Sequence, residues 1–483
     1  MTFHWSYLIV AFIIFEWMLR FAMLFVVPRN RKPSSATAWL MLIMLEPVVG
    51  TAVYVIFGSP QLPKYRRALQ KNADSHIASE LSNIHSAHAG AQVLDSELSE
   101  NEEQFVKLNH ALGGFPIFGG NKVRFYDDYS ESLGSLVKDI DSAKKRILFE
   151  YFIIVLDETS EPVIAALERA QRRGVEVYVL FDALACRNYP DFKKLKNRLT
   201  SSNIQWQAML GFKLRPGKEF TRPDLRNHRK VVVIDGYIGY TGSQNIVTKN
   251  YHRKDSLYYE ELVARLEGPV VWQLSAVFRT DWYAETKNFL SSDLLPKAAG
   301  SVRSQVLPSG PGYRESSNLK LYTALMHSAR KKIVIVTPYF VPDDALMTAI
   351  TSAAQRGVEV TIINSEIIDK VLVGHAQRSY YEELLLSGVR IFLYKKPVFL
   401  HTKHVTVDDT IAVVGSSNFD IRSFELDLEV SLVMYDKKSV ADLRAIEKRY
   451  IETSNQINLK TWLERPLRLK SLDSVARLTA ALQ

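Results

Sequence analysis

The feature that most constrains this chain is an internal duplication. A stretch that begins at Ala143, AKKRILFEYFIIVLDE, resembles a stretch that begins at Ala329, ARKKIVIVTPYFVPDD. Further along, RRGVEVYVLFD (172–182) resembles QRGVEVTIINS (355–365). The offset between the copies falls from 186 to 183 residues, so the pattern indicates two diverged copies of one large unit and not a solenoid of short repeats.

Each copy alternates strand-like and helix-like segments. Gly174 and Gly357 stand where a glycine ends a helix, and the β-branched runs that follow them are typical of buried strands. This alternation predicts an α/β fold in which helices flank sheets of largely parallel strands.

A polar motif of fixed spacing ends each copy. Copy one reads HRKVVVIDGYIGYTGSQN and copy two reads HTKHVTVDDTIAVVGSSN. Both contain H-x-K-x4-D, and in both a G-S-x-N motif begins fourteen residues after the histidine. The motif residues are His228, Lys230, Asp235, Ser243 and Asn245 in copy one, and His401, Lys403, Asp408, Ser416 and Asn418 in copy two. One such match can arise by chance, but two in matching places of a duplication indicate a functional site.

The spacing assigns different tasks to the motif residues. Residues i and i+2 of a strand share a face, so each histidine is expected to point the same way as the lysine two residues later. The aspartate is an odd seven residues from the histidine, so Asp235 and Asp408 are expected to be supporting residues. The serines and asparagines are candidate substrate-binding donors.

These residue types suit attack on a phosphodiester. One histidine can be the nucleophile and the other the general acid, while the lysines stabilise the negative oxygens. This chemistry needs neither a metal nor a cofactor. Glu261 and Glu429 occupy matching positions and are expected to orient the imidazoles. The other histidines, His404 included, are expected at the surface or in packing.

Two apolar runs open the chain. Residues 5–27 can span a bilayer core of about 30 Å, and 38–57 form a second run after the basic turn RNRKPSS. They predict a membrane helical hairpin, because the start lacks the basic residues of a signal peptide. Glu16 and Arg20 are spaced for an ion pair, and Pro47 is expected to bend the second helix. Basic residues after the hairpin favour a cytoplasmic main body, although a hairpin that only dips into the membrane is the alternative.

Composition narrows the remaining classes. Lys and Arg (61) exceed Asp and Glu (52), which gives a net charge of +9 and favours an anionic partner. The single cysteine, Cys186, excludes a disulfide within the chain and argues against a cysteine zinc site. It is expected to be a small buried residue.

Paired H-x-K-x4-D motifs with G-S-x-N resemble the signature of the phospholipase D superfamily, and within it the chain more closely resembles the bacterial-type cardiolipin synthases. The resemblance covers nearly the whole chain and includes LRNHRKVVVIDGYIGYTGSQN, VTPYFVPDDAL and NFDIRSFELDLEVSL. It implies two phospholipase D-like α/β domains related by a pseudo-two-fold axis, with both histidine motifs in one site. The expected organisation is a helical hairpin (1–59), a linker (60–107), a first domain (108–295) and a second domain with an amphipathic tail (296–483).

The resemblance also implies the reaction. Two phosphatidylglycerol molecules would give cardiolipin and glycerol through a phosphatidyl-histidine, with the H-x-K-x4-D residues as the catalytic set. By analogy, His228 is assigned as nucleophile and His401 as acid. The expected partner is an anionic phospholipid membrane and not nucleic acid, and the expected location is the cell (inner or plasma) membrane as a multi-pass protein.

Three other functions remain open at this point. A phospholipase D-type hydrolase would share every catalytic residue and differ only in using water as acceptor. A nuclease fits the basic charge but not the hairpin, and a non-enzymatic scaffold does not fit two intact motifs.

Two basic segments have alternative interpretations. Residues 213–230 are either a lip that meets headgroups or a solvated loop. The tail after Pro466 carries apolar residues at helical spacing, and it is either an interfacial helix or packs on the second domain. These apolar residues are Leu469, Leu472, Val475, Leu478 and Leu482.

Overall fold

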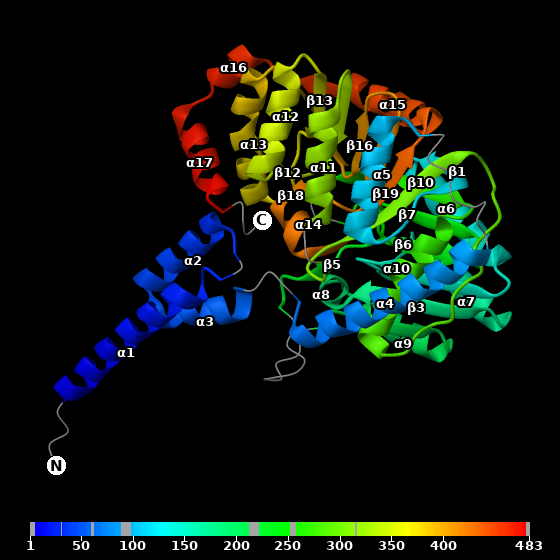
Figure 1. The fold of residues 1–483 in the computed structure, drawn as a ribbon, viewed down its shortest axis with the longest axis horizontal. Helices are drawn as coiled ribbons and strands as arrows, with labels where there is room; N and C mark the ends of the chain where they lie inside the picture. The colour runs from blue at the N-terminus through cyan, green and yellow to red at the C-terminus, as the bar shows by residue number, and fades with distance from the viewer. Residues whose placement is uncertain are drawn as a thin grey trace. The chain divides into compact units, whose positions relative to one another are not determined.

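The computed structural model describes residues 5–29, 31–58, 62–87, 98–211, 222–251, 257–313 and 316–479. The chain divides into two compact units, residues 1–62 (the N-terminal unit) and residues 63–483 (the main unit). The N-terminal unit consists of α1 (Trp5–Val26), α2 (Pro33–Leu45) and α3 (Pro47–Phe57), drawn in dark blue in Figure 1.

The second apolar run is not one bent helix, as the sequence predicted, but two helices. Glu46, between α2 and α3, has φ −132° and ψ 84°, which is not helical. The reason is Pro47, which lacks an amide hydrogen and disfavours the helical conformation of the residue before it. Within the described residues, one helix, Trp5–Val26, is long and apolar enough to cross a membrane.

Small residues and one ion pair hold the N-terminal unit together. A Cβ on Gly50 would lie 2.9 Å from the Cα of Ile43, so only glycine allows this approach of α3 to α2. The guanidinium of Arg20 lies 3.4 Å from Glu16 and also donates to the carbonyl of Met44 at 3.1 Å. The predicted ion pair is therefore present, and it also joins α1 to α2.

The main unit is built on one sixteen-stranded sheet that both copies share. Copy one contributes β1 (Phe118–Tyr126), β2 (Arg146–Tyr151), β3 (Glu176–Asp182), β4 (Gln205–Met209), β5 (Arg226–Asn227), β6 (Val231–Ile234), β7 (Ile238–Gly242) and β9 (Val263–Glu267). Copy two contributes β10 (Val302–Ser309), β11 (Lys332–Val336), β13 (Glu359–Ser365), β14 (Arg390–Tyr394), β16 (His404–Val407), β17 (Ile411–Gly415), β19 (Asp427–Tyr435) and β20 (Ser454–Gln456). Two short two-stranded pairings lie outside it, β12 (Phe340–Val341) with β18 (Phe419–Asp420) and β8 (Tyr258–Glu260) with β15 (Val398–Leu400).

Corresponding strands of the two copies occur in mirrored order on either side of the centre of the sheet. From β10 outward the order is β19, β17, β16, β11, β13, β14, and from β1 outward it is β9, β7, β6, β2, β3, β4. The central strands β1 and β10 are antiparallel, with Phe118 opposite Ser304. The two copies therefore join edge to edge with the relation expected of a pseudo-two-fold axis.

The expectation of largely parallel strands is wrong for most of the sheet. In each copy three strands pair in parallel, β2, β3 and β4 in copy one and β11, β13 and β14 in copy two. The strands between these and the centre pair antiparallel, and so does β20 at the outer edge of copy two. The sequence signal is the dipeptide Asp235-Gly236, whose φ angles are 53° and 68°. Two successive positive φ values define the tight turn that Asp-Gly favours between antiparallel strands, here β6 and β7.

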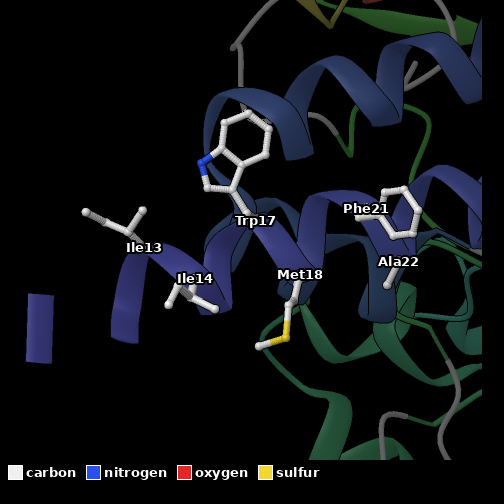
Figure 2. A pocket seen from close by; sticks show the side chains of 6 residues that line it. All are labelled: Ile13, Ile14, Trp17, Met18, Phe21 and Ala22. Carbon is white, nitrogen blue, oxygen red and sulfur yellow. The ribbon is translucent and has the colours of Figure 1, made fainter. Parts of the chain in front are cut away.

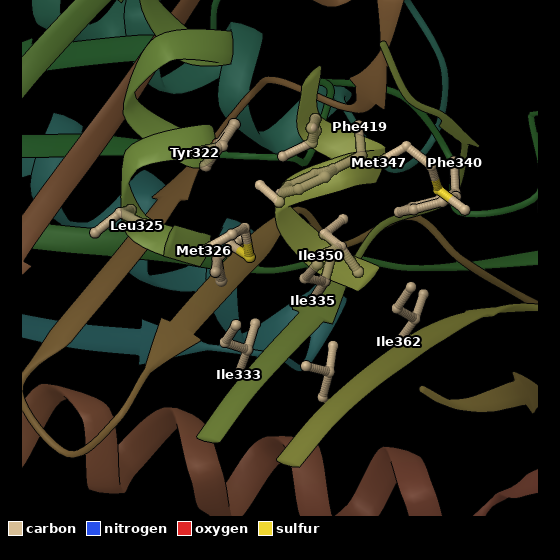
Figure 3. Packing of buried hydrophobic residues seen from close by; sticks show 14 of the residues in the cluster. Tyr322, Leu325, Met326, Ile333, Ile335, Phe340, Met347, Ile350, Ile362 and Phe419 are labelled. Atoms are coloured by element: carbon tan, nitrogen blue, oxygen red, sulfur yellow. The ribbon is translucent and has the colours of Figure 1, made fainter. Parts of the chain in front are cut away.

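Helices cover the sheet and enclose two cores. Copy one has α6 (Tyr129–Ser142), α7 (Glu161–Arg172), α8 (Ala183–Arg187), α9 (Phe192–Ser201) and α10 (Val271–Thr286). Copy two has α11 (Ser317–Ser328), α12 (Asp344–Gln355), α13 (Val371–Leu386), α14 (Ile421–Glu425), α15 (Lys437–Glu452), α16 (Leu459–Leu463) and α17 (Leu467–Arg477). Figure 3 shows side chains of α11 and α12, such as Met326 and Ile350, packed over Ile333 and Ile335 of β11.

The segment predicted as a linker, 60–107, contributes helices to the main unit. It carries α4 (Lys64–Ala87) and the start of α5 (Glu100–Gly113). The guanidinium of Arg279 on α10 donates to both carboxylate oxygens of Glu80 on α4 at 2.9 and 2.8 Å. Arg66 on α4 bonds Glu285 on α10 at 2.8 Å, so buried ion pairs attach α4 to copy one.

Candidate active site

Each histidine motif begins in a three-residue segment that connects two strands, β5 to β6 in copy one and β15 to β16 in copy two. His228 to Lys230 are not part of a strand, and β6 starts only at Val231. Likewise, His401 to Lys403 precede β16. The prediction that the motif opens inside a strand is therefore wrong by three residues, although the Val-, Ile- and Thr-rich runs after it are strands as expected.

Reciprocal pairing between the copies brings the two motifs together. Strand β5, just before His228, runs parallel to the start of β19 in copy two, and the amide of His228 donates to the carbonyl of Leu428 at 2.9 Å. Strand β15, just before His401, runs parallel to β8 in copy one, and the amide of His401 donates to the carbonyl of Glu260 at 2.8 Å. Each histidine thus lies next to the residue that follows its pairing partner, and that residue is a glutamate.

The two glutamates hold the imidazoles of the opposite copies. His228 Nδ1 lies 2.9 Å from Glu429 Oε1, and His401 Nδ1 lies 2.8 Å from Glu261 Oε1. Both glutamates are buried, and the histidines are 8% and 6% exposed. Because an ionised carboxylate only accepts hydrogen bonds, this geometry places the proton on Nδ1 and leaves Nε2 of each ring for chemistry.

The motif lysines fold back beside their histidines. Lys230 Nζ donates to the carbonyl of His228 at 2.7 Å, and Lys403 Nζ donates to that of His401 at 2.7 Å. The ring of Phe152 contacts both Lys230 (5.3 Å) and the imidazole of His228 (4.8 Å). Histidine and lysine therefore lie on the same side in copy one, as the spacing predicted.

Burial and mutual repulsion lower the basicity of all four cationic groups. Burial, together with Lys230, Lys403 and His401, holds the pKa of His228 well below its usual value. Burial lowers the pKa of His401 to about 4 against the opposing charge of Glu261. Burial lowers the pKa of Lys230 to about 7 and that of Lys403 to about 8. Since groups of each copy act on groups of the other, the motifs form one electrostatic site that an anion would stabilise.

The two carboxylates of the site differ. Burial raises the pKa of Glu429, although Lys230 opposes it. Burial acts in the same direction on Glu261, but His401 and Lys403 hold its pKa below the usual value. The His401–Glu261 pair is thus the one whose carboxylate charge is better placed to stabilise an imidazolium.

The motif aspartates lie at the far end of β6 and β16 from the histidines. Asp235 accepts from the backbone amides of residues 144–146 at 2.7–3.0 Å. Asp408 accepts from the amides of residues 330–332 at 2.8–3.1 Å. A four-residue strand of about 13 Å separates each aspartate from its lysine. This placement is the supporting one that the odd spacing predicted.

The second motif faces the glutamates. The hydroxyl of Ser416 donates to Glu429, and the hydroxyl of Ser243 accepts from the amide of Leu262 at 2.9 Å. The side-chain oxygen of Asn245 accepts from the amide of Ile153 at 3.3 Å. Within the described part of the chain, Oδ1 of buried Asn418 has no partner. Substrate binding by these four residues stays a prediction, and the serine hydroxyls already bond the protein.

Sequence reasoning missed Arg229, between the histidine and the lysine. It is 1% exposed, pairs with Asp281 of α10, and its Nε donates to the carbonyl of Glu429 at 3.0 Å. Copy two has Thr402 at this position, so the duplicated pattern gave no signal for it. The one available hint was a charged residue at a position flanked by buried ones.

Several other sequence predictions can be located. Cys186 is fully buried, as expected, and so is His404, whose Nε2 lies 3.5 Å from Glu447. Half of the proposed basic lip, residues 213–221, lies outside the described residues. In the described half, 222–230, neither a lip nor a solvated loop is seen, because its basic residues Arg222, Arg226, Arg229 and Lys230 are all buried.

An open depression lies in the N-terminal unit. Figure 2 shows it on α1, lined by Ile13, Ile14, Trp17, Met18, Phe21 and Ala22. Its lining is wholly apolar, so it cannot serve a phosphodiester and is suited to hydrocarbon.

Comparisons with known proteins agree with this geometry. A family model described as "Cardiolipin synthase, PLD-like domain" matches residues 136–282 and 322–450, once in each copy. A model described as "Phospholipase_D-nuclease N-terminal" matches residues 18–59.

Similar curated proteins cover more than nine-tenths of the chain. "Cardiolipin synthase A" of Proteus mirabilis (strain HI4320) is 33% identical over 470 residues, which is 95% of each chain. "Cardiolipin synthase A" of Pectobacterium carotovorum subsp. carotovorum (strain PC1) is 33% identical over 451 residues, 91% of this chain and 90% of that one. The solved phosphatidylserine synthase of Haemophilus influenzae Rd KW20 shares the fold, with a TM-score of 0.60 at 15% identity over 79% of this chain and 100% of that one.

Proposed function

This chain belongs to the cardiolipin synthase family of phospholipase D-like proteins, and from that premise we propose that it joins two phosphatidylglycerol molecules into cardiolipin and releases glycerol. The observation that carries the proposal is the pair of buried imidazoles, each held at Nδ1 by a glutamate of the opposite copy.

The first half-reaction uses His228 as nucleophile. Its Nε2 attacks phosphorus of one phosphatidylglycerol, the bond from phosphorus to the glycerol oxygen breaks, and His401 donates a proton to that oxygen. The charges support this assignment: the nucleophile must be neutral, and Lys230, Lys403 and His401 all disfavour a proton on His228. The charge of Glu261 opposes the lowering of the pKa of His401 to about 4, and the negative charge of a bound phosphodiester would raise that pKa further, so His401 is the ring proposed to carry the proton once substrate is bound.

The second half-reaction reverses these roles. His401, now neutral, takes the proton from a glycerol hydroxyl of the second phosphatidylglycerol, and that oxygen attacks phosphorus. The bond between phosphorus and His228 breaks, cardiolipin leaves, and both histidines return to their starting states. Lys230 and Lys403 stabilise the charge on the phosphoryl oxygens in both halves. Ser243, Asn245, Ser416 and Asn418 are proposed to line the site.

The location follows from the same proposal. The enzyme acts on phospholipids, and the apolar helix α1 suits anchoring in the cell (inner) membrane. We place the main unit in the cytoplasm, with more than one segment of the N-terminal unit in the bilayer. The helical hairpin, the linker and the two phospholipase D-like domains of residues 108–295 and 296–483 are the proposed organisation.

The test uses the purified full-length protein in mixed micelles with phosphatidylglycerol alone. We expect cardiolipin and glycerol in equal amounts, and neither product from His228→Ala or His401→Ala. Phosphatidic acid without cardiolipin would show that water is the acceptor and would replace transfer with hydrolysis.

A further inference from the structure

The main unit exposes large hydrophobic side chains mainly in one region. Among its described residues, twelve such side chains are exposed; eight of them belong to α13, α16 and α17, and a ninth, Leu478, directly follows α17. Helix α13 packs against both of the others, so the three helices form one surface. Six of the nine, called the apolar rim below, are Val371, Leu372, Leu467, Leu472, Val475 and Leu478.

Helix α17 is inverted relative to an ordinary surface helix, in the sense that it buries a charged residue and exposes apolar ones. Its buried residues are Asp473 and Ala476, which face α13. Asp473 bonds His375 of α13 at 2.7 Å and Arg465 at 2.9 Å. At 100° per residue, Leu467, Val475 and Leu478 lie on the opposite side, where Val475 is 61% and Leu478 84% exposed. Leu472 lies on the flank and is 52% exposed.

This arrangement is unfavourable in water alone. Burial of one such side chain contributes about 1.5–3 kcal/mol, and the rim of α17 leaves four of them exposed while an aspartate occupies the buried face. Attachment to α13 therefore does not explain why α17 is apolar, and the pattern calls for an apolar medium on its outer side.

The charges on α17 identify that medium. The helix carries Arg468, Lys470 and Arg477, and its one acidic residue, Asp473, is buried and ion-paired. Lys470 and Arg477 each lie 3.9 Å from a glutamate of α13, Glu382 and Glu383, in partly solvent-exposed pairs that contribute little by themselves. An outward apolar stripe with basic neighbours is the pattern of a helix that lies in a membrane interface. Each basic residue near an anionic leaflet adds about 1 kcal/mol of attraction.

The rim extends to the candidate active site. Val371 and Leu372 are 70% and 50% exposed and directly follow Lys370. The charge of Lys370 is among those that lower the pKa of His228, and its Nζ lies 5.0 Å from the ring of Tyr339. The start of α13 therefore lies close enough to the histidines for the two to interact electrostatically.

We propose that the apolar rim docks the main unit onto an anionic phospholipid bilayer, with α17 in the interface and Val371–Leu372 beside the entrance for lipid. The choice of a bilayer as the occupant of this surface rests on the proposed function. The observation that α17 exposes its apolar side is independent of that function. This contact is additional to anchoring by α1 and would hold the histidine site at the headgroups.

The chain offers a direct test, because its one cysteine is fully buried. Val475→Cys in the full-length protein carries an environment-sensitive fluorophore, and Leu294→Cys, 88% exposed and outside the rim, is the matched control. Both proteins are placed in vesicles of phosphatidylglycerol with phosphatidylcholine, with and without bromine on the acyl chains. Leu478→Cys is a second rim position in case the first label disturbs folding.

We expect the emission of the fluorophore on the rim to shift to shorter wavelength and to be quenched by brominated lipid, at a depth of about 5–10 Å in the bilayer. The control label should be quenched only by aqueous iodide. Iodide quenching of both labels alike would overturn the proposal. Shielding of the rim label from both quenchers would overturn it too, since protein would then cover the rim. Fluorescence quenching does not depend on catalysis, so loss of transfer activity would leave it unchanged. Failure of the proposed function can therefore be distinguished from failure of the proposed membrane contact.

Discussion

At the scale of single residues, the site is defined by what each imidazole contacts at Nδ1. Glu429 and Glu261 take that position on His228 and His401, which leaves Nε2 as the reactive nitrogen. The two histidines then differ only through their surroundings. Burial and the charges of Lys230, Lys403 and Lys370 lower the pKa of His228, whereas the charge of Glu261 opposes the lowering of the pKa of His401.

Glu429→Gln is the sharpest test of orientation. Glutamine keeps the size but can present its amide nitrogen to Nδ1 and so favours the other tautomer. We expect kcat to fall about a hundredfold or more, the range that acid–base catalysis contributes, with little change in KM. Cardiolipin formation in micelles measures this, with Glu429→Asp as the conservative control. A wild-type kcat would remove the orienting role.

The lysines predict an alkaline limit to activity. Their pKa values, lowered by burial to about 7 and about 8, mean that Lys230 and Lys403 are cationic below this range and lose their charge above it. Because the charged form stabilises the phosphoryl oxygens, kcat/KM should decline as pH rises through 7 to 8. A pH profile in uncharged detergent checks this, and a rate that still rises at pH 9 would contradict it.

At the scale of elements, the motif aspartates build turns and not chemistry. Asp235 and Asp408 have φ of 53° and 49°, a region that aspartate tolerates better than most residues. Each carboxylate also accepts three backbone amides at the start of β2 or β11. The spacing that both copies share thus fixes how β6 and β16 pair with these neighbouring strands.

Asp235→Ala should therefore act mainly on stability. It removes three charge-assisted hydrogen bonds, and we expect a loss of about 2–3 kcal/mol in the free energy of unfolding. Asp235→Asn keeps one acceptor and the left-handed conformation, so its loss should be smaller. Thermal melting ranks the two variants, and Asp408→Ala is the matched case in copy two. An unchanged melting temperature with abolished activity would instead place Asp235 in the chemistry.

At the scale of the whole molecule, one site requires both copies. Strand β5 of copy one pairs with β19 of copy two, and β15 of copy two pairs with β8 of copy one. The shared sheet, in which β1 pairs with β10 at the centre, fixes the distance and angle between the two copies and so allows these strands to pair (Figure 1). The two halves are therefore one structural unit.

Mixing variants tests this unity. His228→Ala and His401→Ala each lose one histidine of the same site, so an equimolar mixture of the two full-length proteins should form no more cardiolipin than either alone. The control is each variant mixed with wild-type protein, which should retain the wild-type activity that was added. Substantial recovery in the mixture would mean that sites exchange halves between chains.

The amino-acid sequence by itself determined the duplication, the motif residues, the apolar start of the chain and the supporting place of the aspartates. These are local features, since strand and helix periods, glycine positions and the conformation around proline act within a few residues. Even so, Glu46 and Pro47 divide a run that hydropathy alone presents as continuous.

Only the tertiary structure decided which partners meet. His228 and Glu429 are 201 residues apart, and His401 and Glu261 are 140 apart, so no spacing rule could assign the crossed pairs. Arg229 was equally inaccessible to pattern. The apolar residues of α17 were visible in the sequence, but which of them face outward depends on which side of the helix packing covers. Contacts between distant segments depend on how surfaces fit together, and that fit is a property of the folded chain and not of any window of its sequence.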